Sequence, residues 1–217
     1  MSLTKTRPQE TTVVIKESLV HKIKVDTRYP CFYSVIEFGF YDDEGFLLPP
    51  SQISKYWDKT EVHKTCRLIR NMIKECFSIS NLYFFIERHA SQLDEHGNEI
   101  SKGRFHLNII TSDIKDDVIQ EPNRKLRRLL LQNGRDGVAI QDMAFNTLDD
   151  LKIELFNTCC RQANWINRYK YSIKTQILNT QSDLENTVMY CLKDYDEVNG
   201  SCFTEIVDFK NSDFNKH

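Results

Sequence analysis

The chain has 217 residues and a formal net charge of −2, from 29 basic and 31 acidic side chains. Its hydrophobic content of 40% is enough for a packed core and excludes a wholly disordered chain. The charge balance excludes a protein that coats nucleic acid through a strongly basic surface, but it is compatible with one local basic face. No run of 18 apolar residues occurs and residues 1–10 are polar, so we expect no membrane partner and no signal peptide.

The cysteines are typical of a protein that works in a reducing compartment. Seven are scattered along the chain and none forms a CxxC pair. This spacing disfavours both a disulfide framework and a zinc ribbon. We therefore expect a cytoplasmic protein.

The first half of the chain predicts strands around one long helix. Residues 1–30 are expected to form an N-terminal extension, a tail or a peripheral strand, in which Val13 to Val25 alternate weakly. Cys31–Phe40 is rich in aromatic and β-branched residues and predicts a buried strand. Between Lys59 and Phe77 apolar residues recur every three or four positions, which predicts an amphipathic helix.

Two further strands are predicted at Asn81–His89 and Arg104–Thr111. The segment between them is polar and contains Gly97 and Gly103. Because a polar connection of this length most simply joins antiparallel neighbours, we expect the two strands to form a long hairpin.

The second half of the chain predicts three helices and two strands. The helices are expected at Asn123–Gln132, Asp149–Arg161 and Ser182–Tyr195, and the strands at Tyr171–Leu178 and Phe203–Phe209. The last helix is expected to begin with a capping box formed by Ser182 and Glu185. This order of elements predicts an α+β fold, with a central antiparallel β-sheet of about five strands and helices packed on it.

The predicted hairpin carries side chains that suit a metal ion. Side chains alternate across a strand, so Glu87 and His89 share one face, and His106 and Asn108 share a face of the next strand. If the register joins these faces, a carboxylate, imidazoles and an amide oxygen converge, a set that holds Mg²⁺ or Mn²⁺. The alternative is an ordinary pair of solvent-facing strand positions.

The last helix carries a tyrosine outside its apolar stripe. The stripe consists of Leu184, Val188, Cys191, Leu192 and Tyr195. Tyr190 lies about 140° from the centre of this stripe, and Lys193 follows one turn later. Tyr190 is therefore either an exposed aromatic residue or a nucleophile, with a lysine beside it that neutralises charge on a phosphate.

These three groups of residues resemble the ordered signatures of the HUH endonucleases. Glu87-Arg88-His89, His106-Leu107-Asn108 and Tyr190-Cys191-Leu192-Lys193 are similar to the metal-site glutamate, the His-hydrophobic-His or His-hydrophobic-Gln motif and the Tyr-x-x-Lys motif of single-tyrosine replication initiators. The resemblance extends from about Cys31 to Phe209. Asn108 departs from the family pattern, which has His or Gln at that position.

The resemblance implies an RRM/ferredoxin-like HUH nuclease fold and a domain division. Residues 31–210 would form the nuclease domain with a helical insertion around 113–168, between the extension 1–30 and a C-terminal tail 211–217.

The resemblance also implies which residues form the site. Glu87, His106 and Asn108 would bind Mg²⁺ or Mn²⁺, His89 would be an additional ligand or phosphate contact, and Tyr190 and Lys193 would be catalytic.

The implied activity is rolling-circle initiation for a plasmid or a virus, in a bacterial or a host cell. Tyr190 would nick an origin in single-stranded or stem-loop DNA, form a 5′-phosphotyrosyl intermediate and later rejoin the strand. A host helicase or polymerase would be a partner, and oligomerisation is compatible with this activity. The DNA-contacting residues would come from two basic runs and comprise Arg124, Arg127, Arg128, Trp165, Arg168 and Lys170.

Three alternatives stay open at this point. One is an HUH transposase or relaxase, although Lys193 favours a replication initiator. The second is an inactive nucleic-acid-binding module of the same fold, with Phe84, Phe85 and Phe105 as stacking platforms or, more simply, as core residues. The third is an interaction protein without a nucleic-acid role.

Overall fold

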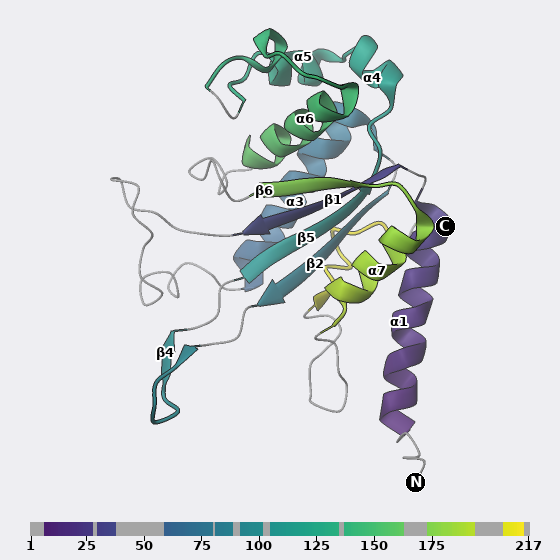
Figure 1. Ribbon diagram of the computed structural model, residues 1–217, viewed down its shortest axis with the longest axis vertical. Helices are drawn as coiled ribbons and strands as arrows, with labels where there is room; N and C mark the ends of the chain where they lie inside the picture. Colours follow the sequence, from purple (N-terminus) through teal and green to yellow (C-terminus); the bar gives the residue numbers. More distant parts are fainter. Residues whose placement is uncertain are drawn as a thin grey trace.

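A four-stranded antiparallel sheet lies between two helical layers in a computed structural model of the chain (Figure 1). The structure describes residues 7–27, 30–37, 59–79, 81–88, 92–101, 105–134, 137–162, 173–193 and 206–214. The strand order is β2-β5-β1-β6, and the strands are β1 (Cys31–Glu37), β2 (Leu82–Arg88), β5 (Phe105–Ser112) and β6 (Ile173–Leu178). A small hairpin of β3 (Gln92–Leu93) and β4 (Glu99–Ser101) lies between β2 and β5 in the sequence.

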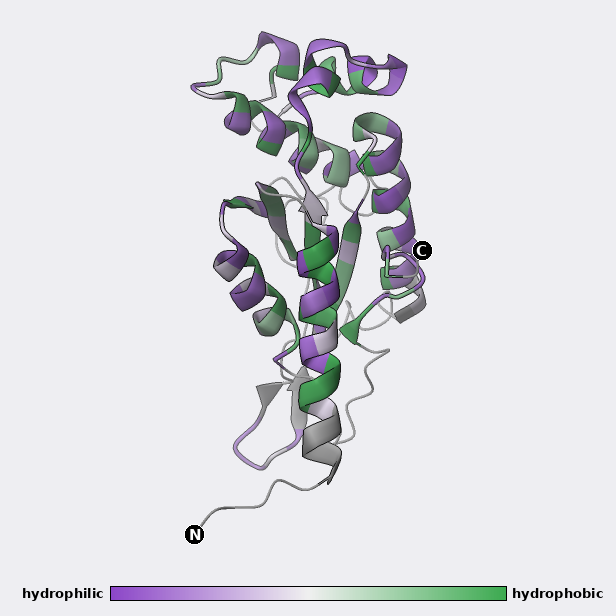
Figure 2. Cartoon of the chain, turned by 90° about the vertical axis from the view of Figure 1, so that its right-hand side faces the viewer, coloured by the Kyte–Doolittle hydropathy of each residue, from purple (hydrophilic) through white to green (hydrophobic). Residues whose placement is uncertain are grey.

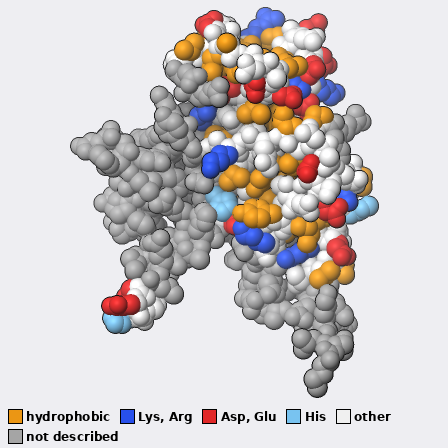
Figure 3. Space-filling view, in the orientation of Figure 1, with side chains coloured by type: hydrophobic (Ala, Val, Ile, Leu, Met, Phe, Trp, Pro, Cys, Tyr) orange, Lys and Arg blue, Asp and Glu red, His pale blue; other side chains and the backbone are white. Residues whose placement is uncertain are grey.

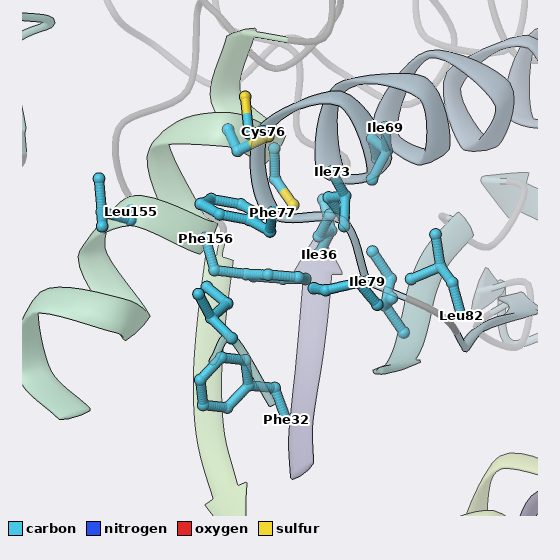
Figure 4. Close-up of a cluster of buried hydrophobic side chains, with 14 of the residues drawn as sticks. Phe32, Ile36, Ile69, Ile73, Cys76, Phe77, Ile79, Leu82, Leu155 and Phe156 are labelled. Atoms are coloured by element: carbon cyan, nitrogen blue, oxygen red, sulfur yellow. The ribbon is translucent and has the colours of Figure 1, made fainter. Parts of the chain in front are cut away.

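One face of the sheet is covered by α3 (Lys59–Phe77) and α6 (Leu148–Gln162), and α5 (Arg124–Leu130) packs against these two helices. The long helix α3 has the predicted bounds, and its apolar side chains at three- and four-residue spacing are buried. In the close-up of this core, Phe77 and Phe156 lie beside Phe32 and Ile36 of β1 (Figure 4). Burial of these large side chains is the main source of stability on this face.

The other face of the sheet is covered by α1 (Arg7–Asp26) and α7 (Gln181–Cys191). Figure 2 shows α7 and α3 on opposite sides of the sheet. The apolar side chains in this second core include, from the helices, Leu19, Val20, Ile23, Leu184, Val188 and Cys191 and, from the strands, Tyr33, Tyr83, Phe85 and Ile110. Lys24 of α1 binds Glu185 of α7 at 2.7 Å, which joins the two helices.

The helix α1 corrects the prediction of a tail or peripheral strand in residues 1–30. Thr12, Leu19, Val20 and Ile23 are buried at helical spacing. Val14 and Val25 are exposed on the opposite side of the helix, and Val13 is exposed at the edge of the buried face. The pattern was misleading because Ile23 and Val25 are separated by one polar residue, as apolar residues of a strand are, although Ile23 is buried and Val25 is exposed in the helix.

The C-terminal segment (residues 206–214) lies along the outer edge of β2. Val207 forms an isolated bridge with Phe85, the amide of Asp208 donates to the Phe84 carbonyl at 3.1 Å, and that of Asp213 donates to the Leu82 carbonyl at 2.9 Å. Two aspartates hold the segment to α3. Asp208 binds His63 at 2.8 Å, and Asp213 binds Arg70 and Lys74 at 2.7 Å each.

The predicted fifth strand at Phe203–Phe209 is therefore reduced to one bridge in the described residues, and residues 203–205 lie outside them. The chain turns after Val207 because the Asp208 side chain accepts the amide of Asn211 at 3.2 Å. The predicted domain division stays a prediction. Residues 211–214, which it assigns to a tail, are buried.

The described residues between β5 and β6 are largely helical, as their basic and apolar patterns predicted. It contains α4 (Asp116–Gln120), which was not predicted, α5, a short 3₁₀ helix (Ile140–Asp142) and α6. The α+β class and the antiparallel sheet are confirmed, with four strands in the described part. No helix among the described residues has the length and apolar character that crossing a lipid bilayer requires.

Candidate functional site

The sheet register brings together the three predicted metal ligands. Glu87 of β2 pairs directly with His106 of β5, and Asn108 lies two residues further along the same strand. Because directly paired residues in an antiparallel sheet point to the same face, the Glu87, His106 and Asn108 side chains all lie on the face covered by α7. The hairpin between β2 and β5 was predicted, and it is what creates this cluster.

The Glu87 carboxylate is the centre of the cluster. Its Oε2 atom lies 2.5 Å from Nε2 of His106 and accepts a hydrogen bond of 3.2 Å from Nδ2 of Asn108. Its Oε1 atom forms an ion pair with Nζ of Lys193. Glu87 and His106 are almost fully buried and Asn108 is fully buried, so each of these contacts is shielded from water.

The other end of the Asn108 amide contacts β1. The Tyr33 hydroxyl donates to Oδ1 of Asn108 at 2.8 Å, and the Cys191 thiol of α7 is a neighbour of this hydroxyl. Burial, and then the neighbouring Cys191, Tyr190 and Glu87, raise the pKa of Tyr33 well above its ordinary value. The hydroxyl of Tyr33 therefore keeps its proton and is a hydrogen-bond donor.

The helix α7 positions Tyr190 and Lys193 at its C-terminal end. Leu184, Val188 and Cys191 are buried against the sheet, as predicted, which leaves Tyr190 on the outer side with 51% of its surface exposed. The helix ends at Cys191 and the amide of Lys193 donates to the Tyr190 carbonyl at 3.1 Å, so Lys193 lies in the turn beyond the helix. Tyr195, the last residue of the predicted stripe, lies outside the described residues.

The start of α7 corrects the predicted capping box. The box is formed by Thr180 and Asp183, whose side chains each accept the other's backbone amide. Ser182 and Glu185 lie inside the helix, where Glu185 binds Lys24 instead. The motif was displaced by two residues because Thr180 and Asp183 have the same capping chemistry at the same spacing.

Lys193 connects the nucleophile candidate to the ligand cluster. Its Nζ atom lies 3.9 Å from the centroid of the Tyr190 ring and also contacts Glu87. Burial raises the pKa of Glu87, but the hydrogen bonds and charges of Lys193 and His106 outweigh it and hold this pKa below its ordinary value. Burial lowers the pKa of Lys193, while Glu87 and Tyr190 raise it by more, so Lys193 stays cationic.

The donor set fits a hard divalent cation in kind. A carboxylate, an imidazole and an amide oxygen suit Mg²⁺ or Mn²⁺, so Glu87, His106 and Asn108 would hold it. Within the described residues no three His, Cys, Asp or Glu side chains form a metal-binding group, and the third donor here is an amide. In the present arrangement, however, the amide nitrogen of Asn108 faces Glu87, and its oxygen faces Tyr33.

The remaining predicted site residues fall into two groups. His89, Trp165, Arg168 and Lys170 lie outside the described residues. Arg124, Arg127 and Arg128 lie on α5, whose Leu126 and Leu129 are buried in the core on the opposite face of the sheet. Basic and acidic side chains are intermixed over the helices at the top of Figure 3. The three arginines are exposed, and their contact with DNA stays a prediction.

Two residues of this region were not predicted from the sequence. Tyr33 hydrogen-bonds Asn108, and Glu37 occupies the register position opposite His106 on β1. The alternation within Cys31–Glu37 predicts that Tyr33 and Glu37 lie on the same face of the strand. Which residues lie next to them depends on the pairing of β1 with β5.

Comparison with known proteins adds no relative to this description. No family model, no curated protein and no solved structure matches the chain.

Proposed function

We propose that this chain is an endonuclease that nicks single-stranded DNA at an origin through Tyr190 and later rejoins the strand, as a replication initiator with the RRM-like HUH nuclease fold. One observation supports the proposal above the others. Lys193 contacts both Tyr190 at the end of α7 and Glu87 at the centre of the His106–Asn108 cluster, so the candidate nucleophile adjoins the candidate cation ligands. Three weak motifs from distant parts of the sequence meet in one place.

Tyr190 is suited to attack because its side chain is half exposed on the outer side of α7. Its phenol oxygen forms a bond to phosphorus while the bond from phosphorus to the 3′ oxygen breaks, and the phenol proton passes to that 3′ oxygen. The products are a 5′-phosphotyrosyl link and a free 3′ hydroxyl. No water is consumed, so a later 3′ hydroxyl reverses the step and rejoins the strand.

Lys193 and the ligand cluster supply the electrostatic part. The Lys193 ammonium next to the Tyr190 ring stabilises negative charge on the phosphate under attack. A divalent ion, when bound, would polarise the phosphate and stabilise the leaving oxygen. Glu87 orients the His106 ring and neutralises the cationic groups around it. Arg124, Arg127, Arg128 and the second basic run would contact the DNA backbone.

The test is to incubate the protein with Mn²⁺ and a library of stem-loop oligonucleotides and to look for covalent adducts on a denaturing gel. We expect an adduct in the wild type and its complete loss in Tyr190→Phe, with oligonucleotide binding retained. Peptide mapping by mass spectrometry should locate the adduct at Tyr190. A persistent adduct in Tyr190→Phe contradicts the assignment of the nucleophile.

Tyr83→Phe is the matched control for this experiment. Tyr83 is a fully buried tyrosine of the same sheet face, and its hydroxyl donates to Asp26 at 3.1 Å, away from the ligand cluster. Its loss should leave the adduct unchanged.

A nucleic-acid-binding module without catalysis is the second candidate, because the Glu87 carboxylate is already neutralised by Lys193 and hydrogen-bonded to His106 and Asn108. Its stacking surface cannot include Phe84 or Phe85, since both are fully buried, as core residues would be. The side chain of Phe105 lies outside the described residues. Oligonucleotide binding that is indifferent to divalent ions, without any adduct, favours this candidate.

A further inference from the structure

The fully buried Asn108 amide is held at both ends, and the direction of these hydrogen bonds bears on cation binding. Its nitrogen donates to Glu87 and its oxygen accepts from the Tyr33 hydroxyl. We infer that Tyr33 is a positioning residue that supports the Asn108 amide in two orientations, the present one and one turned by half a rotation, in which the oxygen faces the cation. The inference rests on the proposed function, because it concerns the cation site of that function.

The present orientation of Asn108 is not competent to bind a cation. Mg²⁺ and Mn²⁺ bind the oxygen of an amide and not its nitrogen. The oxygen is directed to Tyr33 on β1, and the nitrogen is directed to the Glu87 carboxylate. A half turn about the last side-chain torsion exchanges the two ends without moving the backbone of β5.

Tyr33 suits both orientations because a hydroxyl group can donate one hydrogen bond and accept others. In the present orientation it donates to the oxygen of Asn108. In the turned orientation it accepts from the nitrogen of Asn108, and its own proton can be directed to the neighbouring thiol sulfur of Cys191. A side chain without a hydroxyl supports neither state.

The hydroxyl of Tyr33 is more important in the turned orientation. Asn108 is fully buried, and Tyr33 is nearly so. A buried carbonyl oxygen without a partner is tolerated more often than a buried N–H group without one. In the cation-bound state the amide nitrogen of Asn108 faces the side chain of residue 33, and in the present state the amide oxygen faces it. Removing the hydroxyl of Tyr33 therefore destabilises the cation-bound state more than the present state.

The test is a titration with Mn²⁺ alone, followed by the loss of the electron paramagnetic resonance signal of the free ion. We expect Tyr33→Phe to weaken Mn²⁺ binding by about 10- to 100-fold, the usual effect of removing a group that orients a metal ligand. Tyr83→Phe is the matched control, because Tyr33 and Tyr83 both pair with Ile110 and lie on either side of β5. It should leave Mn²⁺ binding unchanged.

A second background separates positioning from general damage to the fold. In Asn108→Asp both ends of the side chain are oxygens, so no turn is needed and Tyr33 donates to it with and without the cation. Adding Tyr33→Phe to Asn108→Asp should therefore change Mn²⁺ binding by no more than about threefold. A merely structural role for Tyr33 would weaken binding equally in the two backgrounds.

Four results overturn the inference, and one of them also overturns the cation site. Unchanged Mn²⁺ binding in Tyr33→Phe, or equal losses in the wild-type and Asn108→Asp backgrounds, contradicts the positioning role and leaves the proposed function intact. If the wild type binds no Mn²⁺, the cation site and this inference both fail. If Tyr33→Phe does not fold, a measurement on the wild type takes the place of the variant. The side-chain amide signals of Asn108 are then followed by nuclear magnetic resonance. They should shift on addition of Mg²⁺, and unchanged signals at saturation contradict the turn.

Discussion

Lys193→Met separates the two roles that Lys193 has in the proposed site. The ammonium of Lys193 occupies one oxygen of Glu87, and a divalent ion at the same carboxylate would be repelled by it. Methionine keeps the length and apolar stem of the side chain but removes the charge. We therefore expect Lys193→Met to bind Mn²⁺ more tightly than the wild type and to form less covalent adduct.

The expected size of the effect on binding follows from the exposure of the pair. Exposed ion pairs contribute about 0.2–1 kcal/mol, whereas removing one partner of a fully buried pair costs about 3–5 kcal/mol. The side chain of Glu87 is only 10% exposed, but that of Lys193 is 39% exposed. Solvent screening therefore brings the free energy of this ion pair closer to that of exposed pairs than to that of fully buried pairs. About 1.4 kcal/mol, or tenfold in the dissociation constant of Mn²⁺, is the expected gain.

The assay is the same Mn²⁺ titration, with adduct formation measured in parallel. Lys193→Arg is the control, because it keeps a cation at this position and should bind Mn²⁺ like the wild type. Adduct formation in Lys193→Met should fall by at least about tenfold, since a cation beside the phosphate is lost. Unchanged or weaker Mn²⁺ binding in Lys193→Met refutes competition between Lys193 and the metal for Glu87.

Two predictions concern stability. The pKa of Glu87 in the folded protein lies below its ordinary value of 4.5, so the free energy that its ion pair contributes is complete above that pH and disappears as the pH falls through the lowered pKa. The difference in the free energy of unfolding between the wild type and Glu87→Gln should therefore be largest near neutral pH and should decrease in acid. Urea denaturation at several pH values measures this difference, and a difference that is constant with pH contradicts the ion pair. Thr180→Ala should destabilise the protein by about 1 kcal/mol, because Thr180 caps α7, whereas Ser182→Ala should be nearly neutral. Equal losses in these two variants, measured by the same denaturation, would show that the cap is not at Thr180.

The parts of the fold that the sequence predicted best are those with one strong periodicity. The helix α3 has its predicted bounds because its buried side chains recur at a single helical spacing. The helix α1 was missed because its exposed valines conceal a similar spacing. The cap of α7 was displaced because two overlapping pairs of residues satisfy the same capping rule, and only the position of the helix on the sheet decides between them.

The candidate site also has features that local sequence patterns predicted and features that they could not predict. Local spacing was sufficient to predict that Glu87 and His106 lie on neighbouring strands and that Tyr190 lies outside the apolar stripe of α7. It could not predict the contact of Lys193 with Glu87, because that contact joins distant parts of the sequence through the packing of a helix end on a strand.

The sequence by itself determined the types of side chain, their alternation along each strand and the helical face on which Tyr190 lies. These properties depend on neighbours within a few positions, where backbone geometry sets direction. The tertiary structure decided which strands lie beside β5. It therefore decided that Tyr33 donates a hydrogen bond to the oxygen of Asn108 and that Glu87 accepts one from its nitrogen. An amide has two chemically different ends of nearly the same shape, and only partners supplied by other strands select between them.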